Sequence, residues 1–181
     1  EIRDAAGGLL LASGTAWQSS VDGPIVHTQL RNGEHYDARR EFKDWPTCAF
    51  VPDVRWRKAA LAASPGGILE AETAIPCRVV RTFEILGEPN TFGVYDIGTN
   101  VSGRCRITVA GTQPGAQIQL DYAERVTEDG DLSKMAQNTL VKTGPFQHEE
   151  YTLKGDGTPE TWESRFTYHG FRYVKVVVRG E

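Results

Sequence analysis

Short apolar runs recur along the chain, and glycine and proline separate them. Alternation with a period of two places successive side chains on opposite faces of a strand, and no stretch keeps a helical period for long. The clearest alternation predicts strands over residues 78–85, 93–97, 104–110, 117–122, 149–154 and 161–179. About ten such strands, with turn residues roughly every 8–12 positions, predict an all-β fold. We expect an antiparallel β-sandwich of the jelly-roll type.

The first part of the chain is less regular. A strand is expected over residues 9–13, and an alanine-rich stretch predicts a short helix over residues 54–63. At Asn32-Gly33 we expect a tight turn of type I′ or a similar form, because both residues tolerate positive φ. In the extended run that follows, one face would carry Glu34, Tyr36 and Ala38, and the other His35, Asp37 and Arg39. This stretch is either a surface hairpin with an Asp37–Arg39 ion pair or the rim of a site for a polyol or a cation.

Length and composition limit the class of protein. The chain has 181 residues, of which 39% are hydrophobic, and we expect one module over residues 1–181 with its own core. A net charge of −4 argues against nucleic-acid binding, and no apolar run is long enough to span a bilayer. The opening Glu1-Ile2-Arg3 has the appearance of a cut within a larger protein. Cys48, Cys77 and Cys105 form no Cys-x-x-Cys pair, so we expect buried free thiols, with one disulfide possible.

No catalytic motif is evident, since Gly-x-Ser-x-Gly, His-Glu-x-x-His, a P-loop and Gly-x-Gly-x-x-Gly are all absent from the sequence. Polar clusters interrupt the apolar strands at residues 96–100, at Glu124 and at residues 168–172, the last of which holds His169 and Arg172. Each cluster is either a hydrogen-bond network at a strand end or part of a shallow polar site. Four aromatic residues are either core or platforms for a sugar: Tyr36, Trp45, Trp56 and Tyr168.

Seven blocks carry a resemblance to a known family, and they are GPI (23–25), GEHYDAR (33–39), PDVRW (52–56), IPCRV (75–79), DIGTNVSG (96–103), YAE (122–124) and WESRFTYHGFRY (162–173). In these blocks the chain resembles the non-catalytic β-domains of bacterial α-L-rhamnosidases, especially their rhamnose-binding carbohydrate-binding module. The resemblance implies a jelly roll that binds terminal L-rhamnose with the help of calcium. It also implies an extracellular or periplasmic parent enzyme, whose catalytic α/α-barrel is absent from this chain. The partners would be rhamnose-containing polysaccharide and that catalytic domain.

The resemblance and the strand pattern together indicate candidate site residues. The sugar-binding candidates are Arg31, Asn32, Glu34, Tyr36, Asp37, Arg39, His169 and Arg172, and the calcium candidates are Arg31, Asn32 and Pro76. Arg31 departs from the acidic residue that would suit calcium, so it could instead donate hydrogen bonds directly to sugar hydroxyls. Two alternatives stay open. One is a purely structural sandwich that supports the catalytic barrel, and the other is a glycan-active enzyme on a jelly roll.

Overall fold

The computed structural model describes residues 1–64, 66–68, 70–85, 87–110, 113–133 and 144–180. Its internal contacts divide the chain into two units. The first combines Glu1–Gly23 with Phe42–Cys77, and the second combines Pro24–Glu41 with Arg78–Glu181. Each unit is described by itself, and the single module over residues 1–181 stays a prediction. Among the described residues, no helix reaches the length and apolarity that a membrane crossing requires.

The first unit holds two small antiparallel pairs. Strand β1 (Ile2–Arg3) pairs with β2 (Leu9–Leu11), and β3 (Gln18–Ser19) pairs with β6 (Arg57–Lys58). The strand expected over residues 9–13 is confirmed in shorter form. The helix expected over residues 54–63 is wrong, because β6 occupies part of that stretch. Helix propensity is a weak preference, and pairing with β3 overrides it here.

Aromatic rings gather in the loops of the first unit. The Trp56 ring lies 5.1 Å from each of the rings of Phe42, Trp45 and Phe50, measured between centroids. The Arg55 guanidinium lies 4.1 Å above the Phe42 ring, in the geometry of a cation–π contact. Trp45 and Trp56, which the sequence left open as sugar platforms, therefore pack on each other, and both pack on Phe50.

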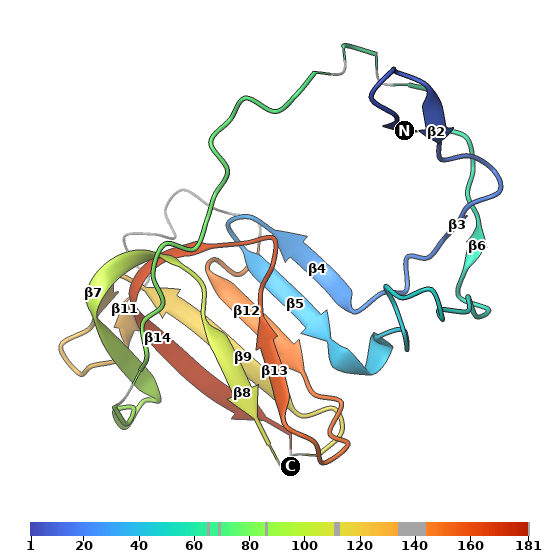
Figure 1. Ribbon diagram of the computed structural model, residues 1–181. Coiled ribbons are helices and arrows are strands. Elements are labelled where there is room, and N and C mark those ends of the chain that lie inside the picture. The colour runs from blue at the N-terminus through green and yellow to red at the C-terminus, as the bar shows by residue number, and fades with distance from the viewer. Residues whose placement is uncertain (65, 69, 86, 111–112, 134–143, 181) are drawn as a thin grey trace. The chain divides into compact units, whose positions relative to one another are not determined.

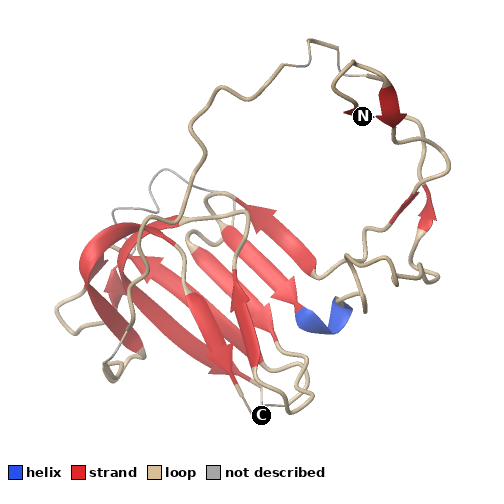
Figure 2. Ribbon diagram, in the orientation of Figure 1, coloured by secondary structure: helices blue, strands red, loops and turns tan. Residues whose placement is uncertain are grey.

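The second unit is built on a six-stranded sheet (Figure 1). Its strands, in spatial order, are β4 (Ile25–Gln29), β5 (Gly33–Asp37), β12 (His148–Thr152), β9 (Gln117–Ala123), β14 (His169–Arg179) and β7 (Val94–Gly103). The pair of β8 (Arg106–Val109) and β13 (Glu160–Glu163) lies across one face of this sheet (Figure 1). Smaller elements are β10 (Arg125–Val126), β11 (Leu132–Ser133) and the 3₁₀ helix η1 (Ala38–Arg40), the only helix of the described residues (Figure 2).

These two layers confirm the all-β prediction and the β-sandwich. One feature departs from a purely antiparallel fold, because β5 and β12 run parallel. The strand expected over residues 78–85 is also wrong: that stretch is irregular, and Val79 and Val80 are exposed. Apolar alternation makes a strand only where a neighbouring strand and an apolar face receive it.

The core lies between the two layers and follows the predicted alternation. In β9 the side chains of Ile118, Leu120 and Tyr122 are buried, and they pack in one cluster with Trp162 of β13 and Phe171 of β14. The pairing of β14 with β7 shifts register between Phe171 and Tyr173, so the inward face changes from odd to even positions and Val174 is buried next. The interruption predicted over residues 96–100 lies opposite this shift, with Gly98 at φ +81°.

The β4–β5 hairpin confirms one half of the turn prediction and corrects the other. Gln29 pairs with Gly33, so residues 30–32 form the connection, and only Gly33 of this segment has positive φ. A type I′ turn at Asn32-Gly33 is therefore wrong. The alternation is confirmed, because the Tyr36 ring faces Tyr151 while the His35 ring faces His27 and His148.

The three cysteines are free thiols, and Cys48 and Cys77 are exposed, which corrects the expectation that all would be buried. Cys105 is partly buried, and that burial raises its pKa to about 12. Since the thiolate is the reactive form, we expect two thiols of the native chain to react quickly with Ellman's reagent at pH 8. The third should react only in denaturant. Fast reaction of Cys105 in the native protein would contradict this accessibility.

Candidate functional site

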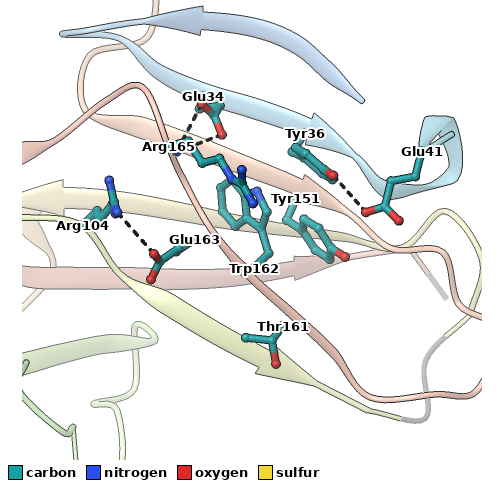
Figure 3. A pocket seen from close by; sticks show the side chains of 9 residues that line it. All are labelled: Glu34, Tyr36, Glu41, Arg104, Tyr151, Thr161, Trp162, Glu163 and Arg165. Carbon is teal, nitrogen blue, oxygen red and sulfur yellow. Dashed lines mark hydrogen bonds and ion pairs between the residues drawn. The ribbon is translucent and has the colours of Figure 1, made fainter. Parts of the chain in front are cut away.

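A pocket of about 470 Å³ opens in the second unit (Figure 3). Nine residues line it, and we call it the aromatic pocket: Glu34, Tyr36, Glu41, Arg104, Tyr151, Thr161, Trp162, Glu163 and Arg165. They come from both layers of the sandwich. Strands β5 and β12 supply residues from the six-stranded sheet, and β13 supplies three consecutive residues from the smaller layer.

One side of the aromatic pocket is a group of three rings. The Tyr36 and Tyr151 rings stack with their centroids 5.8 Å apart, because these residues are direct neighbours in the parallel β5–β12 pair. The Trp162 ring stacks on Tyr151 at 5.3 Å. Figure 3 shows the three side chains grouped together. We call these rings the aromatic wall.

The phenols of the aromatic wall stay protonated. Burial, reinforced by a hydrogen bond to a carboxylate, raises the pKa of Tyr36 and of Tyr151. Tyr36 donates to Glu41 Oε1 at 2.9 Å, and Tyr151 donates to Glu160 Oε2 at 2.7 Å. The wall therefore offers neutral rings whose hydroxyl groups are already oriented.

Charged side chains surround the aromatic wall, and most of them are paired. Glu41 Oε2 lies 2.8 Å from Lys154 Nζ, and Glu163 contacts Arg104 at 3.2 Å and Arg106 at 2.9 Å. The bond from Arg106, with the neighbouring Arg104 charge, lowers the pKa of Glu163. Glu163 is therefore an ionised acceptor near neutral pH, and the two arginines beside it are donors.

Glu34 holds the β13–β14 loop in place at the pocket. Its side chain is fully buried, and it accepts hydrogen bonds from the backbone N–H groups of Arg165, at 3.3 Å, and Phe166, at 3.2 Å. Burial raises its pKa, although the two N–H donors act in the opposite direction. The Thr167 hydroxyl also donates to the Leu30 carbonyl at 3.0 Å. In this state Glu34 positions the β13–β14 loop, and its direct contact with a sugar stays a prediction.

The structure places two of the eight sugar-binding candidates in the aromatic pocket, Glu34 and Tyr36, and six outside it: Arg31, Asn32, Asp37, Arg39, His169 and Arg172. Asp37 and Arg39 form an ion pair at 2.9 Å that caps η1, and this pairing lowers the pKa of Asp37. Arg172 contacts Asp96 at 2.7 Å across the β14–β7 pair. None of these three lines the aromatic pocket.

His169 lies in the core. Its Nε2 is 3.0 Å from Glu149 Oε1, and its ring stacks on Tyr122 with centroids 4.4 Å apart. The Tyr122 hydroxyl donates to the other Glu149 oxygen at 2.5 Å. All three side chains are buried, so this network is a structural element of the sheet.

The calcium candidates offer a poor set of ligands. The carbonyl oxygens of Arg31 and Asn32 accept hydrogen bonds from the N–H groups of Gln147, at 3.0 Å, and His148, at 2.8 Å. Pro76 is exposed and belongs to the first unit. Calcium prefers six to eight oxygens, several of them from carboxylates, whereas this set has no carboxylate and includes a guanidinium. The described residues hold no cluster of three or more His, Cys, Asp or Glu side chains suited to a metal. Calcium therefore stays a prediction on which no step below depends.

Sequence reasoning missed most of the pocket. Trp162, Glu163 and Arg165 belonged to a block of the resemblance without an assigned role, and Tyr151 was part of the strand expected over residues 149–154 without a role of its own. Alternation identified the face of β5 on which the Tyr36 ring lies. It could not show that β5 pairs in parallel with β12, and that pairing brings the rings of Tyr36 and Tyr151 together.

The chain is similar to known α-L-rhamnosidases over most of its length. Residues 4–81 match the α-L-rhamnosidase N-terminal domain, and residues 88–180 match the bacterial α-L-rhamnosidase concanavalin-like domain. The α-L-rhamnosidase of Streptomyces avermitilis is 34% identical over 175 residues, covering 92% of this chain and 16% of the relative. One from Formosa agariphila is 29% identical and covers 91% of this chain and 17% of the relative.

Solved structures give the same relationship. The α-L-rhamnosidase of Dictyoglumus thermophilum superposes with a TM-score of 0.79 at 36% identity, covering 92% of this chain and 18% of that protein. The Streptomyces avermitilis enzyme in complex with L-rhamnose has a TM-score of 0.71 at 34% identity, covering 96% of this chain and 16% of that protein. The chain thus spans less than a fifth of each of these relatives.

Proposed function

This chain belongs to the bacterial α-L-rhamnosidase family, and on that premise we propose that it is a non-catalytic, carbohydrate-binding part of an α-L-rhamnosidase. In this proposal an L-rhamnose residue occupies the aromatic pocket. The parent is a glycoside hydrolase that acts on rhamnose-containing polysaccharide outside the cytoplasm, as the resemblance implies. The catalytic domain of the parent is the second partner.

The observation that carries the proposal is the combination of the aromatic wall with paired charges around it. A sugar presents an apolar C–H face that packs on rings and hydroxyl groups that bond to fixed polar partners. Rhamnose adds a methyl group, which suits the Tyr36 and Trp162 rings. Glu41, Glu163 and Arg104 supply acceptors and donors whose orientation is already fixed by ion pairs. The volume of about 470 Å³ equals that of roughly 15 liquid water molecules, so one sugar residue fits with room for bridging water.

The test is isothermal titration of the chain with L-rhamnose. We expect a weak complex, roughly micromolar to millimolar, because a single sugar buries little area. Tyr36→Ala should weaken it by about tenfold, since it removes one ring of the wall, worth about 1 kcal/mol or slightly more. Tyr173→Ala is the matched control, since this tyrosine is also half-buried but lies outside the aromatic pocket.

The titration has clear contradicting outcomes and includes a chelator control. Absence of heat at millimolar rhamnose, or equal weakening by the two tyrosine variants, would contradict the proposal. A chelator arm addresses calcium separately. Heat that is lost in EDTA and returns with calcium would support the calcium prediction, and heat that is unchanged by EDTA would remove it.

One observation favours a second role, which is packing against the rest of the parent enzyme. Leu30 in the β4–β5 connection and Phe166 and Tyr168 in the β13–β14 loop are large, apolar or aromatic, and about half exposed or more. The hydrogen bond between Thr167 and Leu30 holds these two segments together. Exposed apolar groups that lie close together are typical of protein interfaces. If no sugar binds the isolated chain, this structural role becomes the better account.

A further inference from the structure

We propose that the aromatic pocket takes an acidic saccharide, in which a residue next to the rhamnose carries a carboxylate that pairs with Arg165. This inference rests on the proposed sugar-binding function and adds the class of glycan. It concerns Arg165, whose charged group takes no part in the ion pairs and hydrogen bonds that the described residues form with the other charged side chains of the pocket.

The charges of the pocket form a nearly complete set of pairs. Glu41 is neutralised by Lys154, and Glu163 by Arg104 and Arg106. Glu34 is fully buried and accepts from two backbone N–H groups. Arg165 differs, because within the described part of the chain its guanidinium has no carboxylate at ion-pair distance. A cation in a pocket, without an internal partner, attracts an anionic group of the ligand.

The position of Arg165 is fixed by its backbone. Its N–H donates to Glu34, the preceding Ser164 is completely buried, and the Thr167 hydroxyl holds the loop to Leu30. Arg165 is exposed and lines the pocket, as its side chain in Figure 3 shows. A guanidinium that has no ion-pair partner and is attached to a fixed backbone can form two parallel hydrogen bonds to a carboxylate at little entropic cost.

The alternative of a purely neutral glycan leaves the guanidinium without a matching group. Hydroxyl groups can accept from arginine, but they gain less than a carboxylate does from the charge. The ring faces of the aromatic wall lower the local dielectric, which strengthens a charged pair in the pocket compared with one on open surface. A uronic acid residue beside the rhamnose supplies the carboxylate that the guanidinium can pair with, and it does so on an otherwise sugar-like ring.

The experiment compares three probes by isothermal titration at low salt. They are methyl α-L-rhamnoside, a rhamnosyl-glucuronic acid disaccharide and the same disaccharide with the acid converted to an amide. We expect the acid to bind about tenfold more tightly than the amide, and the difference to shrink at high salt. Arg165→Gln should abolish the difference between the acid and the amide. Arg165→Lys should retain part of it, since lysine keeps the charge without the fork.

Arg125→Gln serves as the matched control, because Arg125 is exposed on β10 and lies outside the pocket. Equal binding of acid and amide by the unmodified chain would overturn the acidic-glycan inference and leave the proposed function standing. Loss of the preference in Arg125→Gln would overturn the assignment to Arg165. Absence of binding by all three probes would overturn the proposed function itself.

Discussion

Replacing Glu149 with leucine is expected to lower the free energy of unfolding by about 3–5 kcal/mol, because each of the two buried polar partners that it leaves behind costs about 1–3 kcal/mol. Glu149 accepts from the Tyr122 hydroxyl at 2.5 Å and contacts His169 Nε2 at 3.0 Å, and none of the three side chains reaches solvent. The leucine variant would leave a hydroxyl and a ring nitrogen without partners in the core. Urea unfolding followed by circular dichroism measures the change.

Two comparisons test whether the network causes that loss. Glu150→Leu changes the adjacent residue of β12, which bonds to Gln117 and Gln119 and is only partly buried, so it should cost less than about 1 kcal/mol. Adding Tyr122→Phe and His169→Phe to Glu149→Leu should recover part of the stability, because the stranded polar groups are then removed as well. Equal losses for Glu149→Leu and Glu150→Leu would contradict the network's role.

The regular part of the second unit could be predicted from the sequence because its signal is local. In β9 the buried side chains of Ile118, Leu120 and Tyr122 are each two positions from the next, and alternation predicts this directly. The same reasoning identified the faces of β5 correctly. It failed over residues 54–63, where pairing of β6 with β3 overrides the helix propensity of the alanines. It also failed over residues 78–85, where the valine alternation has no partner strand to support it.

The aromatic pocket could not be predicted in the same way, because distant segments build it. Glu34 and the loop that it holds are 131 positions apart in the sequence. The match to the N-terminal domain ends at residue 81, yet β4 and β5 belong to the same six-stranded sheet as strands matched by the concanavalin-like domain. Two blocks of the resemblance, residues 33–39 and 162–173, are therefore coupled through Glu34 in space. The two blocks contact each other in the fold, and neither block alone indicates that contact.

Gly33 is the position where this coupling is most sensitive to a single methyl group. Its φ of +122° lies in a region that side-chain-bearing residues rarely adopt, and a Cβ built there would overlap the carbonyl oxygen of His148. That part of β12 cannot move away freely, because the His148 N–H donates to the Asn32 carbonyl at 2.8 Å. The glycine thus lets the β5 and β12 backbones approach each other next to Glu34.

Gly33→Ala is therefore expected to cost at least about 3 kcal/mol, as backbone strain and overpacking act together. The variant should also weaken any rhamnose binding, because displacing β5 shifts Tyr36 against Tyr151 and loosens the Glu34 contacts to the β13–β14 loop. Gly103→Ala in β7 is the control: its φ is ordinary and the nearest atom to an added Cβ is 3.9 Å away, so its stability should change by no more than about 1 kcal/mol. Thermal and urea unfolding of both variants measure the difference. If Gly33→Ala is as stable as Gly103→Ala, the β5 and β12 backbones do not approach closely at this glycine, and the parallel pairing that forms the aromatic wall is wrong.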